Sequence, residues 1–232
     1  MALLNLIFHG HACFRLVNST YDVIIDPFIT NNPLADVTIK DLHPTHILVT
    51  HGHGDHLGDA IALSKDTGAP IIAPNELALY CQSKGANIHP MHIGGSYQFS
   101  FGRVKLTPAW HGSAVIDEKG ITYTGTPCGF LVHMDNKYIY HAGDTGLFGD
   151  MKLIAEMYPL ACALLPIGDN YVMGPDDALR AATMLQAKLT VPMHYNTFPV
   201  IAQDPDQFVK KLKDLHLKGQ VMKPGDKIIL ND

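Results

Sequence analysis

The chain of 232 residues is poor in cysteine, and its four cysteines are far apart in the sequence. Cys13, Cys81, Cys128 and Cys162 include no C-x-x-C pair, so nothing indicates a small disulfide-rich framework. Cysteines spaced in this way suit a reducing compartment, where a thiol serves as a small core residue. We therefore expect a cytoplasmic protein whose cysteines take no part in catalysis or metal binding.

Charge is also sparse, and no extended basic patch is present. Charged residues make up 17% of the chain, and 17 Lys and Arg stand against 22 Asp and Glu, which gives a net charge of −5. The one short basic run, Lys210-Lys211-x-Lys213, falls in an expected helix and is interpreted as a solvated face. A surface of this kind offers no electrostatic footprint for nucleic acid, and we expect no such partner.

Apolar segments are short. The stretch at residues 1–8 has no basic segment before it, and His9 and His11 interrupt it. It is interpreted as a first strand rather than a signal peptide or membrane span, and no membrane partner is expected. With 47% hydrophobic residues the chain can bury a substantial core, and residues 1–232 are expected to form a single domain.

Short apolar runs bounded by turn residues alternate with helical stretches. Strands are expected at 3–8, 13–17, 22–26, 46–50, 70–73, 87–91, 96–101, 103–109, 128–134, 137–141, 161–165, 189–193, 219–222 and 227–230. Helical spacing covers 57–67 and 75–84. Two further helices open at Pro175 and after the N-cap acid Asp204. Strands and helices in both halves predict an α/β fold with four αββα layers, in which two sheets pack face to face and helices cover both outer faces.

The densest group of potential metal ligands is residues 51–56, His-Gly-His-Gly-Asp-His, directly after an apolar run. His51 and His53, at i and i+2 beyond a strand, keep the same facing and aim two nitrogens at one point. Asp55 and His56 follow where the chain turns, so they can face a second point a few ångströms away. Two metal ions held in this way could share one water. The cluster therefore predicts metal chemistry.

Four other segments place an acid or a histidine at or just past the end of an apolar run: they end in Asp26, His111, Asp144 and His194. Together with residues 51–56, and in this order, they resemble the motifs of the metallo-β-lactamase-fold hydrolase superfamily. That superfamily has an early Asp, then H-x-H-x-D-H, a later His, a later Asp and a last His.

Three longer phrases narrow the resemblance. They are His-Ala-Gly-Asp-Thr-Gly at 141–146, Pro-Ile-Gly-Asp-Asn at 166–170 and Pro-Met-His-Tyr-Asn-Thr-Phe-Pro at 192–199. They are similar to a group of small metal-dependent hydrolases related to the ascorbate-6-phosphate lactonase branch.

The resemblance implies that seven side chains hold two divalent metal ions. One ion would be bound by three imidazoles, those of His51, His53 and His111. The other would be bound by Asp55, His56 and His194. Asp144 would bridge the two ions. Asp26 would accept the free ring N–H of a ligand histidine and fix its tautomer; the less favoured alternative is a turn acid before Pro27. Imidazoles and carboxylates are good ligands for zinc and other first-row divalent ions.

Position 53 bears on the metal that is bound. Diiron relatives of this fold, which reduce oxygen or nitric oxide, tend to carry a carboxylate there, which suits iron. His53 therefore favours two Zn²⁺ ions, with Mn²⁺ or Fe²⁺ also compatible with the ligand types.

The implied chemistry is hydrolysis. Two cations sharing a water lower its pKa from 15.7 toward ~7, which makes a metal-bound hydroxide available to attack a carbonyl carbon or a phosphorus. Asp55 and Asp144 are the catalytic candidates, Asp55 because it can orient the hydroxide and take its proton. We find no convincing serine or cysteine nucleophile in the sequence.

Further residues beside the motifs are candidates for substrate contact: His11, Asn170, Tyr195, Asn196 and Thr197. His11 stands in a Gly-His-Ala element that resembles one near the start of the lactonase-branch relatives. His141 is interpreted as structural. The polar stretch 112–127 is either a loop over the cleft or an ordinary surface hairpin.

The leading interpretation is a metal-dependent hydrolase of a small ester, lactone, amide or phosphodiester, with a small molecule as its substrate. A nuclease of the same fold is an alternative, against which stand the acidic balance and a length that leaves no room for an added domain. An inactive metal-binding protein is a second alternative, which the complete ligand set disfavours. A redox role is the weakest, because no flavodoxin-like domain is attached. A homo-oligomer is compatible with the apolar content, and the bond cleaved is not specified by the sequence.

Overall fold

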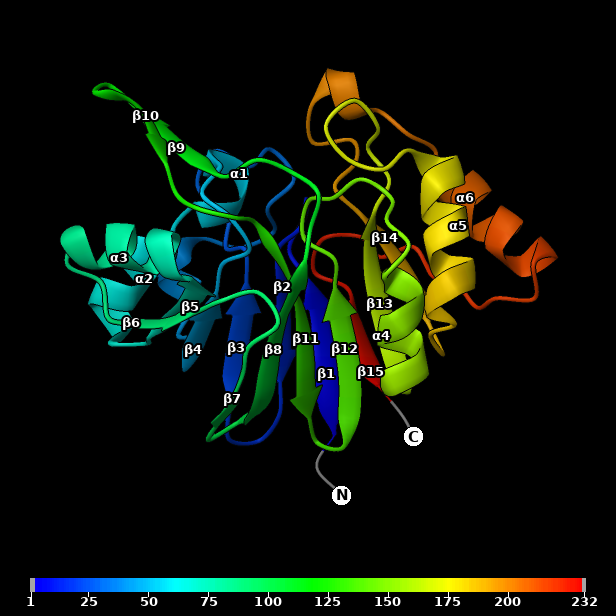
Figure 1. Cartoon of the computed structure of the whole chain (residues 1–232), viewed down its shortest axis with the longest axis horizontal. Helices are drawn as coiled ribbons and strands as arrows, with labels where there is room; N and C mark the ends of the chain where they lie inside the picture. Colours follow the sequence, from blue (N-terminus) through cyan, green and yellow to red (C-terminus); the bar gives the residue numbers. More distant parts are fainter. Residues whose placement is uncertain (1–2, 231–232) are drawn as a thin grey trace.

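The structure is a computed structural model and describes residues 3–230. Its strands form two large sheets and one separate hairpin (Figure 1). The seven-stranded sheet has the order β15-β1-β2-β3-β4-β5-β6, with β1 Leu4–Phe8, β2 Phe14–Val17, β3 Asp22–Ile25, β4 His46–Leu48, β5 Ile71–Pro74, β6 Ile88–Met91 and β15 Lys227–Leu230. The six-stranded sheet has the order β14-β13-β12-β11-β8-β7, with β7 Ser96–Phe99, β8 Gly102–Pro108, β11 Cys128–Met134, β12 Lys137–His141, β13 Leu160–Pro166 and β14 Thr190–Met193.

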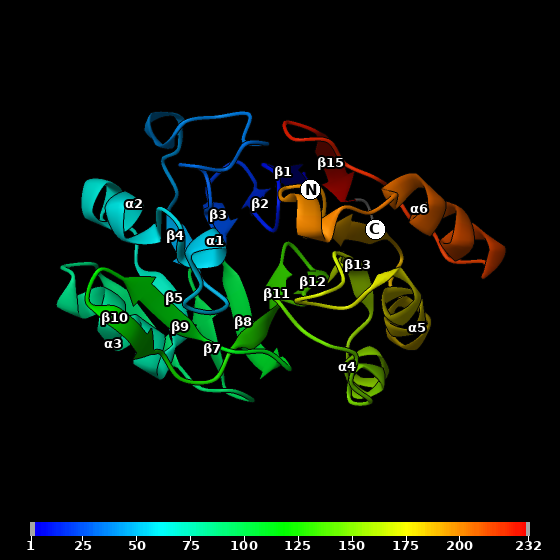
Figure 2. The same ribbon diagram turned by 90° about the horizontal axis from the view of Figure 1, so that it is seen from above.

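The hairpin consists of β9 Ala114–Asp117 and β10 Gly120–Tyr123, which among residues 3–230 pair only with each other. The helices are α1 Gly54–Leu57, α2 Ala60–Thr67, α3 Asn75–Ser83, α4 Met151–Met157, α5 Pro175–Leu185 and α6 Pro205–Asp214, with short 3-10 turns at Ile39–Asp41 (η1) and Pro199–Ile201 (η2). Seen from above, α2 and α3 lie at one end of the molecule and α4, α5 and α6 at the other (Figure 2). No helix among residues 3–230 is long and apolar enough to span a membrane.

Three apolar clusters hold the layers together, and alternation along the strands assigns each residue to one of them. In β11, Phe130 and Val132 point into the cluster between the two sheets, whereas Leu131 between them faces α4, α5 and α6. In β3, Ile25 joins the cluster between the sheets and Ile24 faces the α1–α3 side. Strands buried on both faces read as continuous apolar runs. The predicted four-layer α/β architecture is therefore confirmed.

Two local expectations were wrong. The segment 219–222 is not a strand, because only an isolated bridge joins Gly219 to Thr190; its apolar character reflects Met222, which is buried between the sheets. The helix expected at 57–67 is broken at Gly58 into α1 and α2. Gly58 has φ +41°, and a Cβ there would lie 2.4 Å from the carbonyl oxygen of Pro27, so only glycine fits this turn. The helical spacing of apolar residues continues across Gly58 in the sequence, which is why the break was not predicted.

The topology brings the carboxyl ends of β3, β4, β8, β12 and β14 to one edge of the two sheets, the upper edge in Figure 1. Connections leaving these ends collect above the seam between the sheets, which is where ligand sites form in α/β folds. The motif residues expected from the sequence all lie in these connections.

Candidate metal centre

One residue of the candidate site follows each of the five strand ends. Asp26 comes after β3, His51 after β4, His111 after β8, Asp144 after β12 and His194 after β14. Side chains separated by up to 168 positions in the sequence are thereby brought to one point, because each strand delivers its next residues to the same edge.

The first group consists of His51, His53 and His111, whose ligand atoms all lie within 4.8 Å of one another. Nδ1 of His53 lies 3.0 Å from Nε2 of His51 and 3.2 Å from Nε2 of His111. Nitrogens bound at about 2.0–2.1 Å to a tetrahedral zinc ion stand about 3.3 Å apart, so the three rings are spaced as ligands of one ion. His51 is fully buried, and burial holds its pKa well below its usual value, which keeps the ring neutral and able to bind metal.

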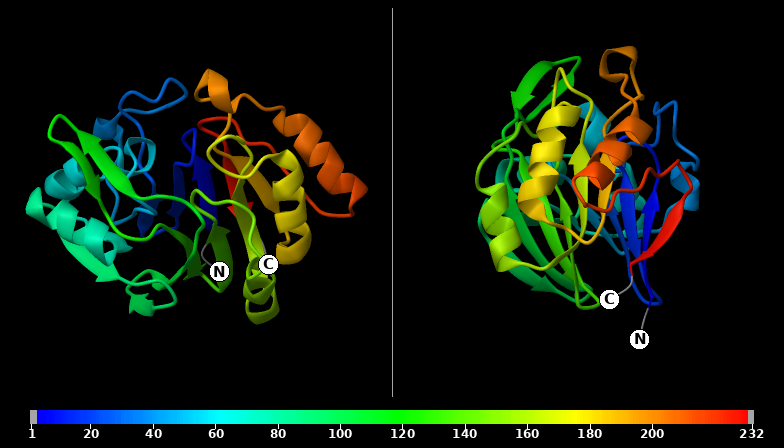
Figure 3. Two further views of the ribbon diagram at one scale, coloured as in Figure 1. Left: turned by 45° about the horizontal axis from the view of Figure 1, so that its top comes forward. Right: turned by 90° about the vertical axis from the view of Figure 1, so that its right-hand side faces the viewer.

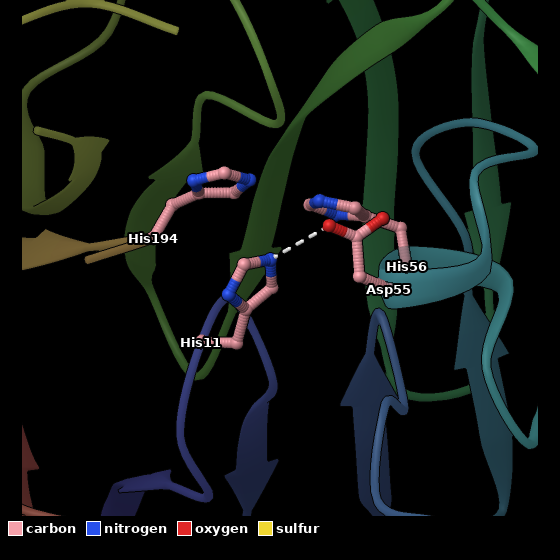
Figure 4. A group of neighbouring side chains, drawn as sticks. All are labelled: His11, Asp55, His56 and His194. Atoms are coloured by element: carbon pink, nitrogen blue, oxygen red, sulfur yellow. Dashed lines mark ion pairs between the residues drawn. The ribbon is translucent and has the colours of Figure 1, made fainter. Parts of the chain in front are cut away.

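The second group contains Asp55, His56 and His194, as the sequence predicted, and His11 in addition (Figure 4). Nε2 of His11 lies 3.2 Å from Oδ2 of Asp55, and its Nδ1 lies 2.8 Å from the hydroxyl of Thr197. Burial, reinforced by nearby His194, lowers the pKa of His11 to about 4, so the ring carries one hydrogen. Because the hydroxyl of Thr197 donates to the carbonyl of Tyr195, it can accept from Nδ1–H of His11, which leaves Nε2 with a free lone pair facing Asp55.

Asp144 lies between the two groups. Its Oδ2 is 3.6 Å from Nε2 of His111 and 3.1 Å from Nε2 of His194, and its Oδ1 is 3.2 Å from Nε2 of His56. Burial by itself would raise the pKa of this carboxyl, but His194 and His56 hold it well below its usual range. Asp144 is therefore an anion placed where a bridging ligand would have to stand.

Asp26 orients two of the imidazoles from beneath. Its fully buried Oδ2 lies 2.7 Å from Nδ1 of His56 and accepts a hydrogen bond of 2.7 Å from the hydroxyl of Thr50. Because that hydroxyl donates to Asp26, it accepts from Nδ1–H of His51, 2.9 Å away. Both rings are thereby held with Nε2 facing the centre. Sequence reasoning missed Thr50; its position directly before residues 51–56 was the available signal.

Several polar atoms at this point are buried without a hydrogen bond inside residues 3–230. They are Nε2 of His11, Nε2 of His56, Oδ1 of Asp144, and both ring nitrogens of His194. Buried polar atoms in folded proteins are nearly always satisfied, so such a concentration needs a reason. Nitrogens and carboxylate oxygens that converge without hydrogen-bond geometry are the donor set of a divalent cation, and the residues present fit two such ions.

The floor of the site is held by hydrogen bonds that cross between the sheets. Nε2 of His141 donates to the carbonyl of Ala12 over 2.9 Å, and the backbone N–H of His194 donates to the carbonyl of His11 over 2.8 Å. Nδ1 of His141 accepts from the backbone N–H of Gly143, the residue before Asp144. Gly143 has φ +63°, and a Cβ there would lie 2.5 Å from the carbonyl oxygen of Cys128, so a side chain would displace this turn.

A cavity of about 520 Å³ opens above the metal-ligand candidates. His53, Asp55, His111, Asp144 and His194 form its floor. The stretch 112–127 contains the hairpin β9–β10, and Ala114, Val115 and Ile116 of its first strand line the cavity. The sequence left two alternatives for residues 112–127, a loop over the cleft and a surface hairpin. The structure combines them, because the segment forms a hairpin whose first strand lines the cavity.

None of the five expected substrate contacts lines this cavity, and two of them, His11 and Thr197, lie instead at the second ligand group. Asn170 is exposed, the side-chain oxygen of Asn196 accepts from the backbone N–H of Gln203, and Tyr195 packs against the cluster beneath α5 and α6. Their neighbours Tyr171 and Phe198 line it instead. Being next to a motif in the sequence was therefore not enough to predict that a side chain faces the cavity.

Metal binding should release protons near neutral pH. Burial opposes a charge on His56, yet Asp144 and Asp26 outweigh it and raise the pKa of His56 well above its usual value. Because the folded pKa is raised, the imidazolium stabilises the metal-free protein fully below about pH 6.5, and this contribution is lost as pH rises through the folded pKa. A metal ion can reach Nε2 only after that proton leaves, so its affinity should increase with pH above 6.5.

Calorimetric titration with zinc at pH 7, in two buffers of different ionisation enthalpy, measures this release. Equal apparent enthalpies in both buffers, or an affinity that is flat from pH 6 to 8, would contradict a histidine-ligated centre.

Comparison with known proteins agrees with this architecture. The model of the family described as beta-lactamase superfamily domain matches residues 21–195. A metal-dependent hydrolase of Desulfitobacterium hafniense is 53% identical over 238 residues, covering 99% of this chain and 100% of the relative; one of Anoxybacillus flavithermus is 54% identical over 228 residues, covering 98% and 100%.

Solved structures show the same likeness. A metallo hydrolase from the hyperthermophilic archaeon Ignicoccus hospitalis is 36% identical, with a TM-score of 0.91 and 99% of each chain covered. An isothiocyanate hydrolase from Delia radicum gut bacteria is 20% identical, with a TM-score of 0.75 and 97% and 98% covered, and shows the fold alone. The suggested relation to the ascorbate-6-phosphate lactonase branch stays a prediction.

Proposed function

The chain belongs to the beta-lactamase superfamily, and from this premise we propose that it is a metal-dependent hydrolase that uses two divalent ions to cleave a small ester, lactone, amide or phosphodiester. The observation that carries the proposal is the convergence of two ligand groups, with Asp144 between them, at the floor of an open cavity. Zinc suits the imidazole and carboxylate ligands, and Mn²⁺ or Fe²⁺ would also be accepted by them.

Bound there, two divalent ions would supply an activated water at neutral pH and polarise the oxygen of the bond to be cleaved. The chain's own residues supply orientation. Asp55 is the acid of the second group that the cavity reaches, with 29% of its side chain exposed, and it can accept a proton from water at the cavity floor. Nε2 of His11 faces Asp55 from the buried side, and the hydroxyl of Thr197 fixes the ring of His11.

A small molecule is the partner that the cavity supports. Its volume of about 520 Å³ falls within the range of roughly 300–1,000 Å³ typical of small-ligand sites. The nuclease alternative would need a cationic track for a phosphate backbone. Among residues 3–230 no lysine or arginine lines this cavity, which favours the small-molecule hydrolase over the nuclease.

Removal of metal tests the proposal directly. Dialysis against a chelator should abolish turnover of a panel of esters, lactones, amides and phosphodiesters, and zinc should restore it because the site residues alone provide no nucleophile. Elemental analysis of the active protein should give two metal ions per chain. Full turnover by metal-free protein would refute the proposal, whereas two bound ions without turnover across the panel would favour the inactive metal-binding alternative.

A further inference from the structure

The cavity walls above the metal centre are apolar. Leu57 of α1, Ile116 of β9, and Phe198 and Val200 around η2 face it, and Tyr171 joins them from the connection after β13. Figure 3 shows the hairpin β9–β10 and η2 rising from the same edge of the sheets, on opposite sides of it. The walls therefore come from four separate connections, which surround the space over the candidate metal ligands.

Three of these wall residues are exposed to solvent to an unusual degree for apolar side chains. The exposed fractions are 72% for Ile116, 57% for Tyr171 and 53% for Val200. Exposed apolar side chains gathered around a concave site mark a binding surface, because contact with an apolar ligand removes them from water. The mouth of the cavity thus has the chemistry of a surface that a hydrocarbon would cover.

The charge of the cavity is confined to its floor. Apart from Tyr171, its titratable lining residues are all metal-ligand candidates, and within residues 3–230 no lysine or arginine lines it to pair with an anion. Lys119, in the turn of the hairpin, is exposed and does not line the cavity. An anionic group at the far end of a substrate would therefore lose its hydration against apolar walls without gaining a partner, which is strongly unfavourable.

We infer that the cavity selects neutral, apolar acyl substrates, namely medium-chain or ring-bearing esters and lactones that carry no phosphate or carboxylate away from the reacting group. The inference rests on the proposed function, since it assigns a substrate class to that site. In the reaction, water adds to the acyl carbon, the acyl C–O bond breaks, and the departing oxygen takes a proton, so that ester and water give acid and alcohol.

The test compares 4-nitrophenyl esters that differ only in the acyl group, using the metal-loaded protein. From acetate to butyrate to octanoate, kcat/KM should rise about three- to fourfold per methylene while the chain remains inside the walls. The half-ester of suberate has the same chain length as octanoate but ends in a carboxylate, and it should be at least about tenfold poorer than octanoate. Equal or better turnover of the suberate half-ester, or a preference for acetate, would overturn the inference.

A charge placed in the wall should reverse this preference. Ile116→Lys should lower kcat/KM for octanoate and raise it for the suberate half-ester, because the ammonium group can pair with the terminal carboxylate. Leu153→Lys is the control, since Leu153 is 52% exposed on α4 and does not line the cavity. The control should leave both values near wild type; equal effects of the two variants would overturn the role of the wall.

Binding of an uncleavable probe separates this inference from the proposed function. Calorimetry should show that 2-nonanone, the methyl ketone with the octanoyl chain, binds more tightly than 8-oxononanoate, the same ketone ending in a carboxylate. Ile116→Lys should weaken the first and strengthen the second. This pattern without ester hydrolysis would support the substrate class while refuting the hydrolase; failure of 2-nonanone to bind would overturn the substrate class itself.

Discussion

Asp144→Asn should nearly abolish turnover and weaken metal binding more than any other isosteric change in this protein. The carboxylate contacts imidazoles of both groups, and the amide would remove the negative charge that two neighbouring cations require. Loss of an outer hydrogen-bond partner of a metal ligand typically costs 10–100-fold in affinity, so loss of a ligand that serves both ions should exceed about 100-fold. Elemental analysis, zinc titration and kcat/KM measure the effect.

Asp150→Asn is the control for this variant. Asp150 lies in the same connection between β12 and α4, but it is exposed and belongs neither to the ligand groups nor to the cavity lining found among residues 3–230. It should retain two ions and wild-type turnover. If Asp144→Asn also retained two ions with full activity, the bridging position assigned to Asp144 would be wrong.

Asp26→Ala should damage both the metal centre and the fold, although Asp26 is not expected to touch a metal ion. The change leaves Nδ1 of His56 and both the N–H and the hydroxyl of Thr50 without their buried acceptor. Metal affinity should fall 10–100-fold because the rings of His56 and His51 lose their orientation. The free energy of unfolding should fall by about 3–5 kcal/mol, as when one partner of a buried pair is removed.

The chain offers a closely matched control for this second variant. Asp36 contacts Nδ1 of His9 over 2.7 Å, the same length as the Asp26–His56 contact, but lies outside the metal centre and is partly exposed. Asp36→Ala should lower stability less, because water can reach the vacated position, and should leave metal affinity unchanged. Chemical unfolding and zinc titration compare the two; a loss of affinity in Asp36→Ala equal to that in Asp26→Ala would indicate a general effect of destabilisation.

The α/β architecture was predictable because strands buried on both faces leave a plain apolar signature. The candidate ligands could be predicted for a different reason. A metal centre needs histidines and acids, and residues 51–56 concentrate them next to a strand end. His11 was expected near the site as a substrate contact. The structure places it instead in the second ligand group, because the left-handed backbone at His11, with φ +56°, turns its ring toward Asp55.

Other features depended on contacts that a single sequence does not display. The role of Thr50 depends on its hydrogen bond to Asp26, which the sequence does not show. Phe198 lines the cavity because of the path of the chain into η2, which the sequence does not show either. The pattern of α4 was missed because this short helix carries exposed apolar side chains, Leu153 and Met157, beside the buried Met151 and Ile154, and this obscures the helical period. The ends of helices and strands and the paths of loops thus depend on tertiary packing and could not be predicted from the sequence. The strands and the candidate ligands could be predicted, because their residue types form recognisable patterns in the sequence.

The hydrogen bonds from His141 to Ala12 and from His194 to His11 join the two sheets beneath the candidate ligands. The hairpin β9–β10, by contrast, pairs with no strand of either sheet. This part of the cavity wall is therefore structurally separate from the strand ends that carry the candidate ligands. If the proposed function holds, changes in the sequence or length of the hairpin should alter substrate preference without moving the candidate ligands. For the protein engineer the same division recommends residues 114–123 as the place to randomise and the strand ends as the places to leave alone.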